Sequence, residues 1–247
     1  MKIVVAEATS LKSAIDSIAS LVEEGVFEIK KDGISLKAMD PSQISMVSFF
    51  MPKEMFVEFD VQEERKIGLD IDQLSSVLSR GNRSEKAELS VDEGRFVIKF
   101  VAEKKRRTFK IPILDIGEGV QKEPKIEYKN FVKISADAFK EVLKDAKLVS
   151  SHLKLSLGAE QFGADVRGDS GDVHEEFDKD SPQIAQISTL VDTKATFPLQ
   201  YLEDISKASP SSEVITIYIE NDKPMKMEYK IQGAEVKYYL APRIENE

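Results

Sequence analysis

The sequence predicts an α+β fold of two similar domains, in each of which two helices cover one face of antiparallel sheet. Three observations predict this fold. A repeat relates the two halves of the chain, strand-like alternation runs through most of both halves, and each half contains two amphipathic helical segments. A chain of 247 residues is long enough for two domains of about 120 residues, each with its own core.

The repeat is the strongest of these signals. Gly68–Val91 aligns with Thr196–Ile219 at a constant offset, and each copy predicts a strand, a helix, a turn and a strand. The aligned pairs include Leu69 and Phe197, Ile71 and Leu199, Leu74 and Leu202, and Glu85 and Glu213. A weaker echo, at a slightly shorter offset that varies along the segment, sets Ser10–Val22 against Ser135–Val149. Such pseudosymmetry suits a subunit that forms a ring with few copies.

The spacing of apolar residues predicts the individual elements. Alternation with a period of two predicts strands at Lys2–Val5, Val26–Lys30, Ile34–Ala38, Met46–Phe50, Ala87–Val91, Phe96–Val101, Leu153–Leu157, Val214–Ile219, Met225–Ile231 and Val236–Leu240. An apolar side at helical spacing predicts helices at Leu11–Val22, Ile71–Arg80, Ala136–Val149 and Leu199–Ala208. Turn residues separate the later strands, as at Asn221-Asp222 and Gln232-Gly233.

One segment without any sustained period divides the chain. Ile113–Tyr128 contains two glycines, a proline and clustered charge, which is typical of a linker that crosses the surface. We therefore expect an N-terminal domain over residues 1–112, a linker over 113–128 and a C-terminal domain over 129–247.

Composition narrows the class of protein. No apolar run approaches the roughly 18 residues of a membrane span, and the N-terminal residues lack the apolar region and cleavage site of a leader, so we expect an intracellular protein. The absence of cysteine excludes disulfides, thiolate nucleophiles and Cys-ligated metal sites. The net charge of −9 disfavours simple tight binding to nucleic acid, unless basic residues are segregated on one face or retention on DNA does not depend on affinity.

Motifs for catalysis or metal binding are missing. His152 and His174 have neither a Cys beside them nor a second His at helical spacing, so they are more typical of ordinary loop or strand residues than of zinc ligands. Asp165–Glu176 superficially resembles a calcium loop, but Arg167 and Ser170 occupy the positions that need an acid or amide and a glycine. We expect no enzyme activity, no cofactor and no metal.

The helix over Ala136–Val149 separates its charges by sign. Its apolar stripe is flanked by a basic stripe, which consists of Lys140, Lys144 and Lys147, and by an acidic stripe, which consists of Asp137, Glu141 and Asp145. A solvated helix with intrahelical ion pairs is one interpretation. The other is a helix that faces phosphates on one side and a basic neighbour on the other. Further candidates for the basic surface are Lys12, Arg80, Arg83 and Lys207.

Three stretches resemble the DNA sliding clamps of the proliferating cell nuclear antigen (PCNA) family, archaeal type. Asp32–Met46 is similar to their central loop, Thr196–Pro210 to the second helix of their second domain, and Met227–Glu247 to their C-terminal strand and tail. The likeness covers the whole chain in order. It implies the DNA clamp fold, a ring of three subunits with sheets outside and helices lining the hole, which encircles duplex DNA as a non-catalytic processivity factor.

The resemblance also implies the site residues and partners. The partners are DNA polymerase, the clamp loader, flap endonuclease and ligase, which bind through short peptide motifs to a pocket of Met39, Gln43, Ile44, Met46, Tyr128, Pro224, Tyr239, Ala241 and Pro242. The subunit interface would pair strands near Arg107–Pro112 and Asp172–Asp178, with contributions from Arg80, Arg107, Phe109, Glu141, Asp145, Glu175 and Phe177.

The expected location is the cytoplasm, at the nucleoid, if the source is archaeal, and the nucleus if it is eukaryotic. Two alternatives stay open, which are one subunit of a heterotrimeric clamp and a scaffold that uses the pocket without encircling DNA.

Overall fold

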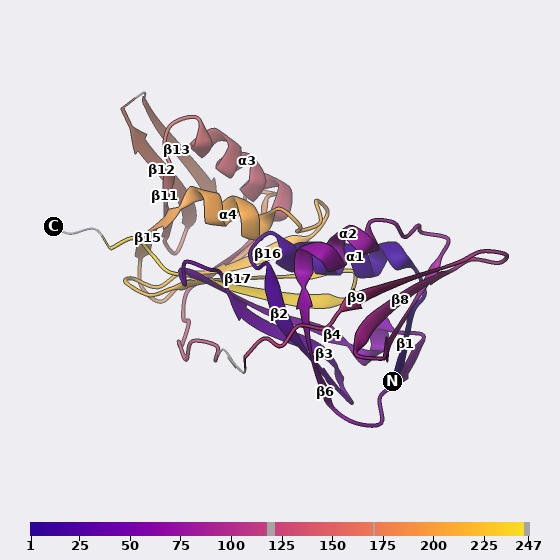
Figure 1. Ribbon diagram of the computed structural model, residues 1–247. Coiled ribbons are helices and arrows are strands. Elements are labelled where there is room, and N and C mark those ends of the chain that lie inside the picture. The colour runs from indigo at the N-terminus through magenta and orange to yellow at the C-terminus, as the bar shows by residue number, and fades with distance from the viewer. Residues whose placement is uncertain (118–121, 170, 245–247) are drawn as a thin grey trace. The chain divides into compact units, whose positions relative to one another are not determined.

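The computed structural model describes residues 1–117, 122–169 and 171–244, and the chain forms two compact units (Figure 1). The first unit comprises Met1–Pro41, Val47–Glu123 and Lys230–Val236, and the second comprises Ser42–Met46, Pro124–Tyr229 and Lys237–Glu247. Part of the expected linker, residues 118–121, lies outside the described residues. No helix among the described residues combines the length and the apolar character needed to cross a membrane.

The first unit places a pair of helices over antiparallel strands. Its elements are β1 (Lys2–Val5), α1 (Ala8–Ala19), β2 (Glu24–Lys30), β3 (Gly33–Met39), β4 (Ser45–Pro52), the short 3₁₀ helix η1 (Lys53–Met55), β5 (Glu58–Asp60), β6 (Arg65–Asp70), α2 (Ile71–Leu78), β7 (Lys86–Asp92), β8 (Arg95–Val101) and β9 (Arg106–Pro112). One sheet has the order β5-β1-β7-β8-β9, and β4-β3-β2-β6 follow one another in a second. The helices pack against each other, with α1 on β1 and β7 and α2 on β2, β6 and β9.

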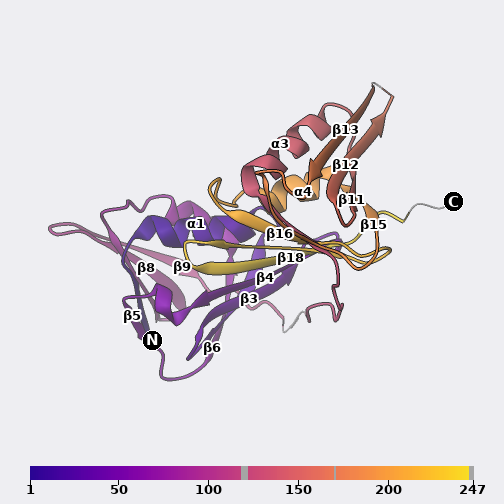
Figure 2. The same ribbon diagram turned by 180° about the vertical axis from the view of Figure 1, so that it is seen from behind.

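The second unit repeats this plan. Its elements are β10 (Phe131–Ser135), α3 (Ala136–Lys147), β11 (His152–Leu157), β12 (Gln161–Gly168), β13 (Gly171–Asp178), β14 (Ile184–Ser188), β15 (Thr193–Pro198), α4 (Leu199–Ser206), β16 (Val214–Tyr218), β17 (Met225–Ile231) and β18 (Ala234–Leu240). One sheet has the order β13-β12-β11-β15, and β14-β10-β16-β17 follow one another in the other. Seen from behind, α3 and α4 lie beside these strands (Figure 2), and α3 packs on β12 and β13.

The constant offset of the repeat relates whole elements. It separates both the first and the last residues of α1 and α3, of β6 and β15, of α2 and α4, and of β9 and β18. The weaker echo at a shorter offset is therefore wrong. It matched Ser10 with Ser135, but Ser135 is the N-cap of α3, where its hydroxyl accepts from the Ala138 N–H, whereas Ser10 lies inside the first turn of α1. A serine before an apolar run signals a helix start only when it is the capping residue.

The four predicted helices are confirmed, and α2, α3 and α4 begin at the predicted residue. α1 begins at Ala8 rather than Leu11, because its polar first turn carries no apolar period. All four end before the predicted residue. In α2 the apolar side chains at helical spacing are buried, and the Asp70 carboxylate caps the helix by accepting from Gln73 N at 2.7 Å.

The segments that leave β9 and β18 take equivalent paths in the two units. After β9, the N–H of Leu114 donates to the Gly68 carbonyl at 2.8 Å, and after β18, the N–H of Arg243 donates to the Thr196 carbonyl at 2.8 Å. Gly68 and Thr196 are partners in the repeat. The first segment leads into the linker, whereas the second is the C-terminal tail.

Candidate functional surfaces

The predicted basic stripe lies on α3, and each of its lysines has an acceptor within the second unit. Lys140 donates to the backbone carbonyl of Ser209, Lys144 lies 2.6 Å from Glu141, and Lys147 lies 2.9 Å from Glu203. Burial lowers the pKa of Lys140, whereas the side chains of Lys144 and Lys147 are 67% and 61% exposed. The stripe thus presents cations that neighbouring acceptors partly compensate. Lys144 and Glu141 lie one turn apart on α3, so this ion pair is of the kind expected for a solvated helix.

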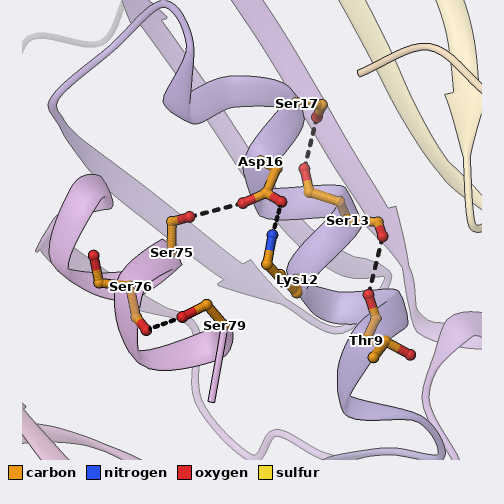
Figure 3. A network of polar contacts seen from close by, with 9 residues as sticks. Thr9, Lys12, Ser13, Asp16, Ser17, Ser75, Ser76 and Ser79 are labelled. Carbon is orange, nitrogen blue, oxygen red and sulfur yellow. Dashed lines mark hydrogen bonds and ion pairs between the residues drawn. The ribbon is translucent and has the colours of Figure 1, made fainter. Parts of the chain in front are cut away.

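The corresponding helices of the first unit carry a polar network around Lys12 (Figure 3). Lys12 forms an ion pair with Asp16 one turn along α1, and the other oxygen of Asp16 accepts from Ser75 of α2 at 2.7 Å. Ser13 and Ser17 donate to backbone carbonyls within α1, at 3.0 and 2.6 Å. The Ser75–Asp16 hydrogen bond links the two helices, and Asp16 partly compensates the charge of Lys12.

The remaining predicted DNA-facing residues lie at the C-terminal ends of helices. Arg80 and Arg83 follow α2, and Lys207 is the C-cap residue of α4, and all three are exposed. Arg83 approaches Glu7, with 3.4 Å between Nε and Oε2. Arg80 and Lys207 lie next to the last turns of α2 and α4, where cations interact favourably with the helix dipole, so these two have a structural reason to be present.

β9 is an edge strand, and its covered side chains are Arg107, Phe109 and Ile111. Phe109 packs on Phe100 of β8, with 5.8 Å between ring centroids. The guanidinium of Arg107 donates to the Glu85 carboxylate at 2.5 Å and to the Arg80 carbonyl at 2.8 Å. Glu85 is a residue that we did not predict as part of a site, because an acid in a turn carries no distinctive signal of its own.

β13 is the edge strand of a sheet in the second unit, and its covered side chains are Val173, Glu175 and Phe177. Phe177 packs on Phe162 of β12, with 6.3 Å between centroids. Burial, and then the negative charge of Asp145 on α3, raise the pKa of Glu175. Its Oε1 is buried and has no hydrogen-bond partner in the part of the chain that the structure describes. The acids of α3 and β13 therefore face one another.

Two groups of the predicted pocket residues are brought together within the second unit. The central loop meets the strand and tail at the C-terminus, because Ser45 donates to the Tyr239 carbonyl at 3.1 Å and the Ala241 N–H donates to the Ile44 carbonyl at 3.0 Å. Gln43 occupies the left-handed backbone region, with φ 58°, and Ile44 is 37% exposed, whereas Met46 is buried. Met39 belongs to the first unit.

The second group of pocket residues is built around Tyr128, whose hydroxyl donates to the Pro224 carbonyl at 2.9 Å. Its ring lies 5.5 Å from that of Tyr218, and the ammonium of Lys226 lies 3.7 Å from the Tyr218 centroid and 5.4 Å from that of Tyr128. Burial raises the pKa of both tyrosines. Tyr218 and Lys226 were not among the predicted pocket residues, because only the sheet register brings them together beside Tyr128.

The repeated α+β units, each with a helix pair over its sheets, define a two-domain clamp fold. The sequence matches the family model of the proliferating cell nuclear antigen, N-terminal domain, over residues 1–116, and the C-terminal domain over residues 122–244. A DNA polymerase sliding clamp of Methanococcus maripaludis (strain S2) is 36% identical over 243 residues, which cover 95% of this chain and 96% of that protein. The chain belongs to the PCNA family.

Other relatives agree over the full length. A DNA polymerase sliding clamp of Thermofilum pendens is 32% identical over 247 residues, which cover 99% of this chain and 100% of that protein. The crystal structure of PCNA from Thermococcus kodakaraensis has a TM-score of 0.92 at 24% identity and covers 98% of this chain and 99% of that chain. A PCNA of A. fulgidus bound to the C-terminal region of FEN-1 has a TM-score of 0.88 at 24% identity and covers 100% and 99%. These structures share the fold.

Proposed function

We propose that this protein is a DNA polymerase sliding clamp, a ring-forming processivity factor that encircles duplex DNA and tethers polymerase to it. The full-length relation to sliding clamps, at 36% identity over 95% of the chain, is the observation that carries this proposal. Its role is mechanical and non-catalytic. Its source is archaeal and its place the cytoplasm, at the nucleoid.

The ring forms through the two open edges. β9 presents Arg107 and Phe109, and β13 presents Glu175 and Phe177, so pairing of β9 with β13 of a second copy would join a cation to an acid and bury both phenylalanines. Because the two edges differ, the contact is head-to-tail, and three copies close it into a ring. Exposed ion pairs contribute only about 0.2–1 kcal/mol each, so strand hydrogen bonds and apolar contacts provide most of the association energy.

A ring also explains how a negatively charged protein can be retained on DNA. With a net charge of −9, tight binding to phosphates is disfavoured, but a closed ring stays on the duplex because of topology. The basic stripe on α3 and the cations near α2 and α4, together with Lys12 of α1, then need to make only weak contacts that slide along the duplex. The cations near α2 and α4 are Arg80, Arg83 and Lys207.

Partner enzymes would bind the second unit through short peptides. The exposed Ile44 and the tail that follows Tyr239 offer apolar and rigid contacts, and the Tyr128–Pro224 group offers aromatic ones. The expected partners are polymerase, flap endonuclease, the clamp loader and ligase. The structure of A. fulgidus PCNA bound to the C-terminal region of FEN-1 supports flap endonuclease as a partner.

Retention on circular DNA tests the proposal. The labelled protein is loaded on a nicked plasmid by a clamp loader, separated from free protein by gel filtration, and followed before and after a restriction enzyme linearises the plasmid. A sliding clamp elutes with the circle and is lost from the linear DNA. Equal retention on both forms would mean affinity rather than topology, and absence from both would favour a scaffold that never encircles DNA.

A further inference from the structure

Glu85 is a buried carboxylate with a specific task in the first unit. Its residue is 4% exposed, in the turn between α2 and β7. One oxygen, Oε2, accepts from the backbone N–H of Asn82 at 3.0 Å and from Arg107 Nη2 at 2.5 Å. The backbone of Glu85 is also fixed, because its carbonyl accepts from Ala8 N at 2.8 Å. A carboxylate held by two elements is a rigid support for the guanidinium.

Arg107 is held at the open edge but is not saturated. Its Nη2 reaches Glu85 and the Arg80 carbonyl, and its Cζ lies 5.2 Å from the centroid of the Phe100 ring. The Nε donor is buried and has no acceptor in the part of the chain that the structure describes. Buried donors are nearly always paired in a complete structure, so this one points to an acceptor from outside the chain.

The fold itself does not require this arrangement. At the equivalent positions in the second copy of the repeat, Glu213 is exposed and Glu235 replaces Arg107. The turn before β16 forms without a buried carboxylate, and β18 forms without a guanidinium. The pair of Glu85 and Arg107 is therefore specific to the edge strand β9, where another chain can add.

We propose that Glu85 is a positioning residue for ring closure, which fixes the Arg107 guanidinium so that its free Nε donates to an acceptor of a second copy of this chain. The inference rests on the proposed function. The matching acceptor is the Glu175 carboxylate at the edge of β13, whose buried Oε1 lacks a donor among the described residues. Because Glu85 already holds the planar guanidinium in place, Arg107 loses less conformational entropy on association than an unrestrained arginine would.

Sedimentation equilibrium of the full chain tests the inference. Glu85→Gln removes the charge with little change of shape, and we expect the trimer to dissociate at about tenfold or more higher protein concentration than the parent. Asp92→Asn is the matched control, because Asp92 also pairs with a cation of β9, Lys110 at 2.6 Å, but on the exposed face. This control should assemble within about twofold of the parent.

A double-mutant cycle separates positioning from general support of the fold. If Glu85 acts through Arg107, then Glu85→Gln has no further effect in an Arg107→Met background; equal losses in both backgrounds would overturn the proposal, as would parent-like assembly of Glu85→Gln. Thermal melts identify a variant that fails to fold. If Glu85→Gln fails to fold, Arg107→Lys provides the test, because it keeps the positive charge and removes the planar guanidinium. Parent-like assembly of Arg107→Lys would refute the inference. A parent that stays monomeric would overturn the ring itself.

Discussion

The helices α1 and α3 hold equivalent places in the two units, yet their surfaces differ. Lys12 of α1 corresponds to Lys140 of α3, so one cation is common to both. The acidic stripe of α3, Asp137, Glu141 and Asp145, corresponds to Thr9, Ser13 and Ser17 of α1. The fold accepts hydroxyls at these positions, since Ser13 and Ser17 are satisfied by their own backbone (Figure 3). The fold therefore does not require acids at these positions of α3, and we propose that they face the arginine edge of a neighbouring copy.

The largest expected effect concerns a second difference between the units: the segment after β18 is the C-terminal tail, whereas the equivalent segment after β9 leads into the linker. Ile44→Ala combined with Pro242→Ala should weaken binding of a polymerase-tail peptide about thirtyfold, since truncating anchors in a central contact commonly costs ~2 kcal/mol or more. Leu114→Ala is the control, because Leu114 is the repeat partner of Pro242 but leads into the linker. Calorimetry measures both. Unchanged affinity in the double variant would mean that partners bind elsewhere.

A second prediction addresses the acidic stripe directly. Glu141→Ala combined with Asp145→Ala should weaken the trimer, and more so at low salt, because exposed pairs worth about 0.2–1 kcal/mol each recur at every interface of the ring. Ser13→Ala combined with Ser17→Ala changes the equivalent positions of α1 and should leave assembly unchanged. Light scattering at two salt concentrations compares them. If both double variants assemble identically, the acidic stripe of α3 has no role in subunit association.

The basic stripe gives a smaller effect. Replacement of Lys140, Lys144 and Lys147 with Ala should reduce loading on DNA, and each lost phosphate contact lowers the slope of log affinity against log salt by roughly 0.9. Lys12→Ala removes one cation instead of three, and that cation pairs with Asp16, so it should lower this slope by no more than roughly 0.9. Sliding-dependent synthesis at several salt concentrations provides the measurement. A triple variant that matches the parent at every concentration would make the stripe a solvated face.

The smallest expected effect is on pH dependence. Asp165, and then Glu176, raise the pKa of His174 on β13, so its contribution to stability is present below its ordinary pKa and is lost as pH rises through the raised value. Burial, and then the charge of Arg243, lower the pKa of His152, so protonation of this residue destabilises the fold as pH falls through its ordinary pKa. Melting curves across pH 5–8 should therefore diverge from the parent at the low-pH end and in opposite directions: His174→Gln is destabilised relative to the parent there, and His152→Gln is stabilised.

Much of the fold was predictable because the helices and the alternating strands each bury one face, which leaves a clear period. β12 was missed since Gly163 interrupts the apolar pattern, and a Cβ there would meet the Ser156 hydroxyl at 2.5 Å. β10 was also missed. Its apolar Phe131 lies directly beside the buried Val132, which obscures the alternation. Site residues were harder to predict, because Glu85 and Lys226 act through partners on other strands and only the sheet register brings these together.

The pairing of β9 with β13 is the central claim, and a cysteine pair tests it most directly. The chain contains no cysteine, so Thr108→Cys and His174→Cys, on the exposed faces of the two edges, report only on each other. A short bis-maleimide joins them, and denaturing gels and mass spectrometry count the subunits. The account predicts covalent species that end at three subunits, closed in a circle. Only single chains, or a ladder that continues beyond three, would contradict it.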